Sequence, residues 1–135
     1  MSAQDSLGRQ WKQLDMYKTA KELRATRLGD VESAKIWDAG RTPDHEIEKN
    51  VMDQKLDNSR KSGLYDSIKA QGVTTPVYIS NIKPSAYKES AFTGVIKDVN
   101  PAYVPPSGDI VMNGHHRIAA AHDIDPNMVI PVEHG

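Results

Sequence analysis

The sequence predicts an α+β fold, in which a small mixed sheet packs against helices and follows a helical N-terminal extension. Residues 1–63 carry 12 basic and 11 acidic side chains, whereas residues 64–135 carry 5 and 7. Seven of the eight prolines lie in the second stretch. A charge-dense, nearly proline-free segment is typical of helices, and a stretch rich in proline and β-branched residues favours strands and turns. We therefore expect helices first and a sheet afterwards.

Length and composition exclude several classes of protein. The 135 residues suit one domain with one core. The absence of cysteine excludes a disulfide framework and a thiol nucleophile, and it is compatible with a reducing, cytosolic setting. We expect neither a membrane span nor a secretory signal, because the apolar runs are short. The net charge of −1 argues against nucleic-acid binding through bulk charge, so any phosphate chemistry must be local.

Residues 1–55 are predicted as the helical extension. Trp11, Leu14 and Tyr17 recur at helical spacing, and Leu23 continues the same helix. This apolar stripe is thin, so the helix is expected to lie on the domain surface or on a partner. The extension is therefore where we expect a protein partner or a second copy of the chain to bind.

Two more helices are expected before the sheet. Asp30 is the predicted N-cap of a helix that ends at Gly40. Thr42 as cap and Pro43 in the first turn begin the next one. The apolar positions of these helices are Val31, Ala34 and Trp37 in the first, and Ile47, Val51, Met52 and Leu56 in the second.

Residues 56–135 are predicted to form the domain proper, with a loop insertion at 81–108. The first helix of this domain is expected to lie between Gly63 and Gly72. Its first strand begins at Pro76, a position where proline is tolerated. The elements expected after residue 62 are a helix to residue 72, strands at 76–80, 92–96, 108–112 and 128–132, a loop at 103–108, and a helix at 113–122.

The last strand-to-helix junction carries the candidate chemistry. Asn113 can cap the helix, and Gly114 lets the backbone approach a ligand where the free N–H groups meet the positive end of the helix dipole. The guanidinium of Arg117 matches two phosphate oxygens, and His115 and His116 can change charge near neutral pH. The pattern predicts an anion site. A glycine before polar residues also begins helices for purely structural reasons, so both interpretations stay open at this point.

A protein-bound metal is not expected at these histidines. His115 and His116 are adjacent, so on a helix their side chains point about 100° apart. His115 and His122 share a face but lie two turns, roughly 10 Å, apart. Magnesium carried by a nucleotide remains an option, because it needs few protein ligands.

Two sequence blocks stand out in the predicted domain. The block at 64–79 has the pattern Ser-Ile-x-x-x-Gly-x-x-x-Pro-Val, and the block at 110–121 has Gly-x-His-Arg-x-x-Ala. Together with Ile130-Pro-Val132, they resemble the ParB/sulfiredoxin superfamily over residues 58–132, in the form of a stand-alone ParB-like nuclease domain of the bacteriophage type. The resemblance implies a domain that holds nucleotide phosphates at the second block.

The resemblance also implies roles for single residues. Gly114 and the following amides would hold a phosphate, Arg117 would pair with it, and His116 matches the histidine that precedes the arginine in sulfiredoxin-like and free-serine-kinase-like members. The resemblance assigns further nucleotide contacts to Ser67 and to Arg60 or Lys61. Arg60 and Lys61 fit a solvated helix entrance equally well.

The chain departs from the family pattern in three places. Sulfiredoxins carry a catalytic cysteine where this chain has His115, which excludes sulfinic-acid reductase chemistry. Chromosome-partitioning members have Gly-Glu-Arg-Arg where this chain has Gly-His-His-Arg, and the free-serine kinases have an acid at Asn113. The match includes no helix-turn-helix DNA reader, so sequence-specific DNA binding is not expected.

Three functions are open from the sequence. The first is a nuclease or phosphotransferase acting on a nucleotide (ATP or CTP, with magnesium) or on nucleic acid without sequence preference, in which Arg117 stabilises phosphoryl charge and His115 or His116 transfers a proton. The second is a nucleotide- or phosphate-binding module without turnover. The third is a catalytically silent bacteriophage structural or interaction protein that docks through its N-terminal helices. The expected location is the host cytoplasm, or the virion for a phage-encoded protein.

Overall fold

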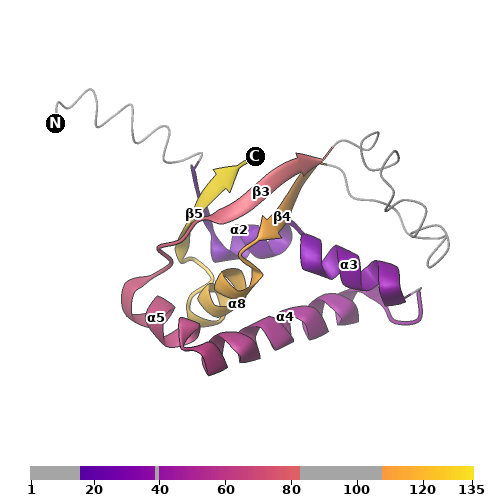
Figure 1. Cartoon of the computed structure of the whole chain (residues 1–135), viewed down its shortest axis with the longest axis horizontal. Coiled ribbons are helices and arrows are strands. Elements are labelled where there is room, and N and C mark those ends of the chain that lie inside the picture. Colours follow the sequence, from indigo (N-terminus) through magenta and orange to yellow (C-terminus); the bar gives the residue numbers. More distant parts are fainter. Residues whose placement is uncertain (1–15, 39, 83–107) are drawn as a thin grey trace.

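The computed structural model describes residues 16–38, 40–82 and 108–135 (Figure 1). This part of the chain has an α+β fold, as the sequence predicts. Its five-stranded sheet has the order β1-β5-β3-β4-β2 and is mixed, because β1–β5 and β3–β4 are antiparallel while β3–β5 and β2–β4 are parallel. The strands are β1 (Tyr17–Thr19), β2 (Arg27–Leu28), β3 (Val77–Ile82), β4 (Gly108–Asn113) and β5 (Val129–His134).

Helices cover one side of this sheet, with α4 along the lower edge of the view in Figure 1. None of the described helices is both long enough and apolar enough to cross a membrane. The helices are α2 (Ala20–Ala25), α3 (Gly29–Asp38), α4 (Asp44–Ser62), α5 (Leu64–Gln71) and α8 (His115–Ile124).

The parallel pair β2 and β4 sets the starting points of two helices. Leu28 lies opposite Val111, and each strand leads directly into a helix, β2 into α3 and β4 through Gly114 into α8. Both helices therefore begin at the same edge of the sheet. The close approach also explains Gly29, since a Cβ there would lie 2.7 Å from the carbonyl oxygen of Val111.

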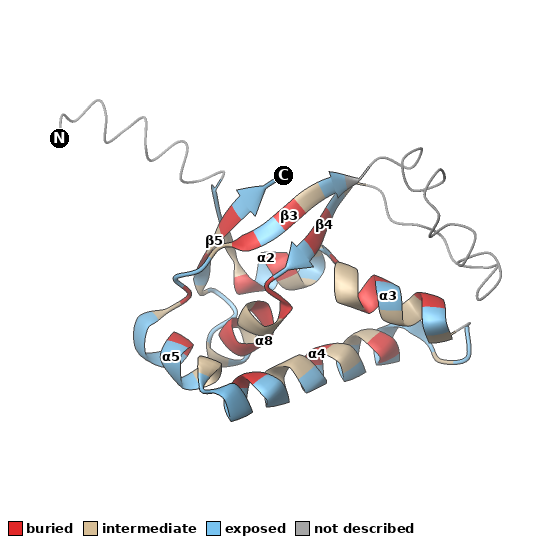
Figure 2. Ribbon diagram, viewed as in Figure 1, coloured by how far each residue is buried: buried red, intermediate tan, exposed pale blue. Residues whose placement is uncertain are grey.

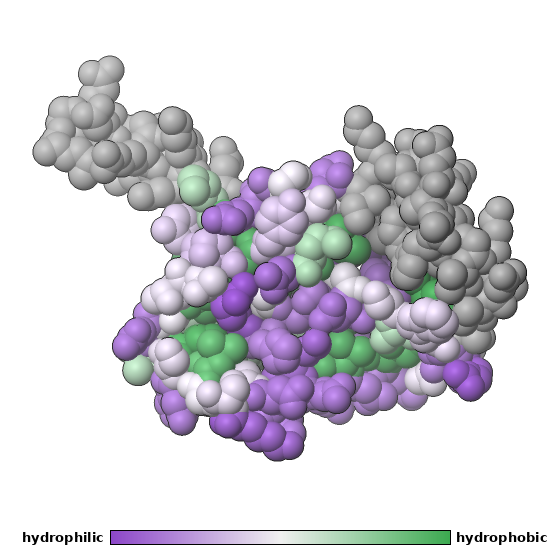
Figure 3. Space-filling model, in the orientation of Figure 1, coloured by the Kyte–Doolittle hydropathy of each residue, from purple (hydrophilic) through white to green (hydrophobic). Residues whose placement is uncertain are grey.

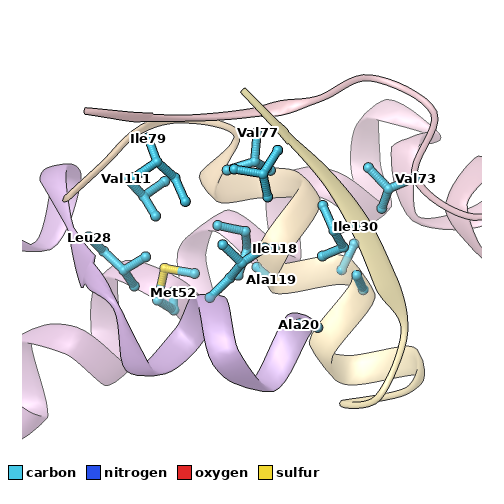
Figure 4. Close-up of a cluster of buried hydrophobic side chains, with 14 of the residues drawn as sticks. Ala20, Leu28, Met52, Val73, Val77, Ile79, Val111, Ile118, Ala119 and Ile130 are labelled. Atoms are coloured by element: carbon cyan, nitrogen blue, oxygen red, sulfur yellow. The ribbon is translucent and has the colours of Figure 1, made fainter. Parts of the chain in front are cut away.

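One hydrophobic core fills the space between the sheet and helices α2, α4 and α8 (Figure 4). Buried and more exposed positions alternate along β3 and β5, whereas Ile110 and Val111 of β4 are both buried (Figure 2). Because the strands and helices contribute to one cluster, the core joins segments far apart in the sequence. Its members include Ala20, Leu23, Leu28, Met52, Val77, Ile79, Val111, Ile118 and Ile130.

The N-terminal segment is built into this domain, which corrects the expectation of a single surface helix through Tyr17 and Leu23. Tyr17 lies in β1 and pairs with Pro131 of β5. Thr19 then caps α2 in a capping box with Glu22, and Leu23 is fully buried. The apolar stripe is thin because a six-residue helix between two edge strands needs few anchors. The hydrophobic core thus continues across the boundary predicted at residue 55.

Some predicted details of α3 and α4 differ from the structure. Asp30 lies inside the first turn of α3 rather than at its cap, because the helix begins directly after β2. Trp37 is 57% exposed, and the neighbouring Ile36 is fully buried instead. Pro43, rather than Thr42, occupies the N-cap position of α4, and no side chain caps that helix.

Both ends of the insertion predicted at 81–108 belong to paired strands of the sheet. Asn81 and Ile82 belong to β3, and Ile82 pairs with Gly108, the first residue of β4. The strand predicted at 92–96 and residues 103–107 of the loop predicted at 103–108 lie outside the described residues, as do Trp11 and Leu14, while Gly108 begins β4 instead.

Truncating Leu23 tests whether the N-terminal segment belongs to the core. Leu23→Ala is expected to lower the free energy of unfolding by about 2–5 kcal/mol, because it leaves a cavity in a fully buried site. Lys21→Ala on the exposed side of the same helix is expected to change it little. Urea denaturation of both variants measures the difference. Equal stabilities would contradict a shared core.

Candidate anion-binding site

The N-termini of α3 and α8 meet at one point of the structure. The backbone N–H of Asp30, in the first turn of α3, donates a hydrogen bond to Nε2 of His115, the first residue of α8, over 3.2 Å. The side chain of His115 is 3% exposed. Each helix start carries the positive end of a helix dipole, so two such ends together favour a negative charge.

Gly114 makes the turn from β4 into α8. It occupies the N-cap position with φ of 105°, a left-handed conformation that favours glycine. A Cβ there would lie 2.7 Å from a methyl carbon of Val77 and 3.1 Å from the guanidinium of Arg117. Asn113 ends β4 and makes no capping hydrogen bond, which corrects the predicted cap. The predicted close backbone approach is therefore taken up by neighbouring side chains of the domain.

Arg117 lies against this turn and is only partly satisfied. Its Nη2 donates to the carbonyl oxygen of Pro76 over 3.0 Å. Its Nε is buried and has no hydrogen-bond partner among the described residues. An unsatisfied buried donor costs about 1–3 kcal/mol. The group is thus an unused donor beside the start of α8.

Lys55 reaches the same point from α4. Its ammonium lies 2.7 Å from the carboxylate of Asp30, which is also 3.4 Å from Nδ1 of His115. The contact joins α3, α4 and α8 through side chains. We refer to Asp30, Lys55, His115, His116 and Arg117 as the helix-terminus cluster.

The electrostatics of the cluster keep His115 neutral and Asp30 charged. Burial lowers the pKa of His115, the charges of Lys55 and His116 lower it further, and Asp30 opposes them. Partial burial raises the pKa of Asp30, but the hydrogen bond from Lys55 and nearby positive charge outweigh it, and the pKa is lowered overall. A neutral ring with its proton on Nδ1 suits both contacts of His115, since Nε2 must accept the N–H of Asp30.

His116 is the accessible histidine of the cluster. Its side chain is half-buried on the first turn of α8. Burial lowers its pKa, and the positive charges of Lys55 and Arg117 lower it further while Asp30 raises it. A neutral, partly exposed imidazole can accept or donate a proton near neutral pH.

The remaining predicted contacts lie elsewhere. Arg60 pairs with Asp123 over 3.2 Å and covers the ring of Tyr65 at 5.0 Å, at the end of α8 opposite to the cluster. Lys61 pairs with Asp57 on the exposed side of α4. Ser67 is exposed on α5, and its hydroxyl makes no hydrogen bond within the described residues. The structure therefore brings together Gly114, His115, His116 and Arg117 but none of Arg60, Lys61 and Ser67.

Sequence reasoning missed Lys55 and the role of Asp30. Lys55 lies on the same face of α4 as the buried Met52 and Ser59, and a lysine inside a buried stripe is a signal that could have found it. Asp30 follows Gly29, which comes directly after β2, just as Gly114 comes directly after β4 at the start of α8.

A separate polar cleft of about 290 Å³ lies between α2, β2, α3 and α4. Its charged walls are paired with one another, since the buried carboxylate of Glu32 holds Arg27 at 3.5 Å and Lys35 at 3.2 Å. Hydrophilic residues also separate the hydrophobic patches on the face shown in Figure 3.

Among the described residues, no group of three His, Asp or Glu side chains is arranged to hold a metal ion.

Comparisons with protein-family models, with curated proteins and with solved structures return no match for this chain.

The buried imidazole of His115 predicts a pH dependence of stability. Its pKa is lowered from 6.5 in the folded state, so the unfolded chain binds the proton more readily. The contribution of the neutral His115 ring to the stability of the folded state is complete above about pH 6.5. It is lost as the pH falls towards the pKa of His115 in the folded state. We therefore expect the free energy of unfolding to fall as the pH is lowered from 7.5 to 5.

His115→Gln is expected to flatten this dependence, and His45→Gln, at an exposed position of α4, is the control. Urea unfolding at pH 7.5, 6 and 5 measures both variants. A slope that is the same in His115→Gln as in the wild type would rule out this histidine as its source.

Proposed function

We propose that this protein binds a nucleotide through its phosphates at the helix-terminus cluster. The observation that supports the proposal is the meeting of the α3 and α8 N-termini at the ends of two parallel strands. Helix starts provide N–H donors and a positive potential, and ligands of α/β proteins bind outside the carboxyl ends of strands. Lys55, and Arg117 beside Gly114, add two cations near these helix starts.

The ligand that we propose is ATP or CTP with magnesium carried on its phosphates. A polyphosphate suits a cluster that combines two cations with one internal carboxylate, because only a strongly charged anion competes with that carboxylate. Magnesium needs few protein ligands when phosphates hold it.

The catalytic form of the proposal is phosphoryl transfer or nuclease-like hydrolysis, as the ParB/sulfiredoxin resemblance implies. His116 fits proton transfer, because it is partly exposed and its pKa is lowered. His115 is buried with both ring nitrogens towards Asp30, which suits a role in holding α3 against α8. Nucleic acid would be bound without sequence preference.

The alternative, a silent bacteriophage interaction protein that docks through N-terminal helices, has less support. The described residues of the predicted extension supply β1, β2 and part of the core, so they are used inside the domain. Trp37, 57% exposed on α3, is a side chain that remains for a partner in that region.

Arg117→Ala tests the nucleotide proposal. It is expected to weaken binding of ATP or CTP about tenfold or more, because it removes a charge-assisted hydrogen bond to phosphate. Arg60→Ala removes a guanidinium of α4 that pairs with Asp123 near the other end of α8, and it is expected to leave nucleotide binding unchanged. Isothermal titration with ATP, ADP and CTP in magnesium measures affinity, and circular dichroism checks that each variant folds.

The same proteins are then assayed for phosphate release and for cleavage of plasmid and single-stranded DNA. His116→Ala is expected to abolish turnover while nucleotide binding persists. Absence of binding to every nucleotide by the folded wild type would refute the proposal, and equal turnover in the wild type and His116→Ala would refute its catalytic form.

A further inference from the structure

The ion pair between Lys55 and Asp30 differs from the other lysine pairs of α4. Lys49–Asp53 and Lys61–Asp57 are local pairs, four residues apart, whose side chains are more than half exposed. Lys55 is 22% exposed and reaches a different helix. Burying a lysine costs free energy, so its position calls for a reason other than solubility.

The carboxylate of Asp30 stands where an external anion would be stabilised. It accepts from the ammonium of Lys55 at 2.7 Å and lies 3.4 Å from the ring of His115 in the first turn of α8. It also lies in the first turn of its own helix, α3. The same surroundings would favour a phosphate oxygen, and two anions in one such place repel each other.

We propose that Lys55 is a phosphate-binding residue and that Asp30 is the internal anion that holds it until the ligand arrives. On binding, the ammonium of Lys55 exchanges the carboxylate for a phosphate oxygen. This inference rests on the proposed function and adds its selectivity. Because a carboxylate must be displaced, the site prefers di- and triphosphates, with their higher charge, over monovalent anions.

Neutralising the carboxylate tests the exchange. Asp30→Asn keeps the backbone N–H that His115 accepts but removes the competing charge. It is expected to tighten binding of pyrophosphate and ATP about tenfold, because a like charge beside the phosphate is removed. Asp57→Asn makes the same change of net charge at a surface pair of α4 and is expected to have little effect.

Removing the ammonium tests the other half of the pair. Lys55→Gln is expected to weaken pyrophosphate binding about tenfold, and Lys55→Arg, which keeps the cation, to retain most of it. Lys61→Gln is the matched control on the same helix. Titration calorimetry of the full chain gives the affinities, and thermal unfolding shows that the compared variants are folded.

The outcomes separate this inference from the proposed function. Tighter binding by Asp30→Asn and weaker binding by Lys55→Gln support it, whereas binding that appears only in Asp30→Asn refutes the proposed function and this inference with it. If the wild type binds and Asp30→Asn binds equally or more weakly, the inference is wrong while the proposed function stands. If neither the wild type nor Asp30→Asn binds pyrophosphate or ATP, both are wrong.

Discussion

The parallel pairing of β2 with β4 is the constraint on which the rest of the candidate site depends. Two strands that run in the same direction end at the same edge of the sheet, so the helices that follow them start side by side. Gly29 permits the close approach of the backbones, and Gly114 makes the left-handed turn into α8. The hydrogen bond from Asp30 to His115 then joins the two helix starts. Without this pairing, the α3 N-terminus and the α8 N-terminus would not share one electrostatic environment.

The polar groups of the helix-terminus cluster lower the stability of the folded protein. It contains a buried histidine that must stay neutral, a half-buried ion pair and a guanidinium Nε with no partner in the described residues. Hydrophobic side chains of similar size would serve packing as well or better. Buried polar groups that make a core less stable tend to be found at functional sites. The helix-terminus cluster is therefore a stronger candidate for a functional site than the polar cleft around Glu32, whose charges are paired with one another.

The sequence predicted what is local and missed what depends on distant partners. The passage from β4 through Gly114 into α8, and the helix that ends at Gly72, are set by neighbouring residues and were found. Strands β1 and β2 have three and two residues, and they exist because β5 and β4 offer edges to pair with. Lys55 was missed for the same reason, since only the packing of α4 on α8 shows that it, and not Arg60, faces the cluster. The family resemblance remains a prediction.

The central claim, that the two helix starts form one anion site, is tested most directly by amide chemical shifts. A ¹⁵N-labelled full chain would be titrated with pyrophosphate and followed by heteronuclear correlation spectra. The account predicts that the largest shifts occur together at the N–H groups of Asp30 and of His115 to Arg117, with a single dissociation constant. Shifts confined to residues around the cleft at Glu32, or no saturable shift at either helix start, would contradict it.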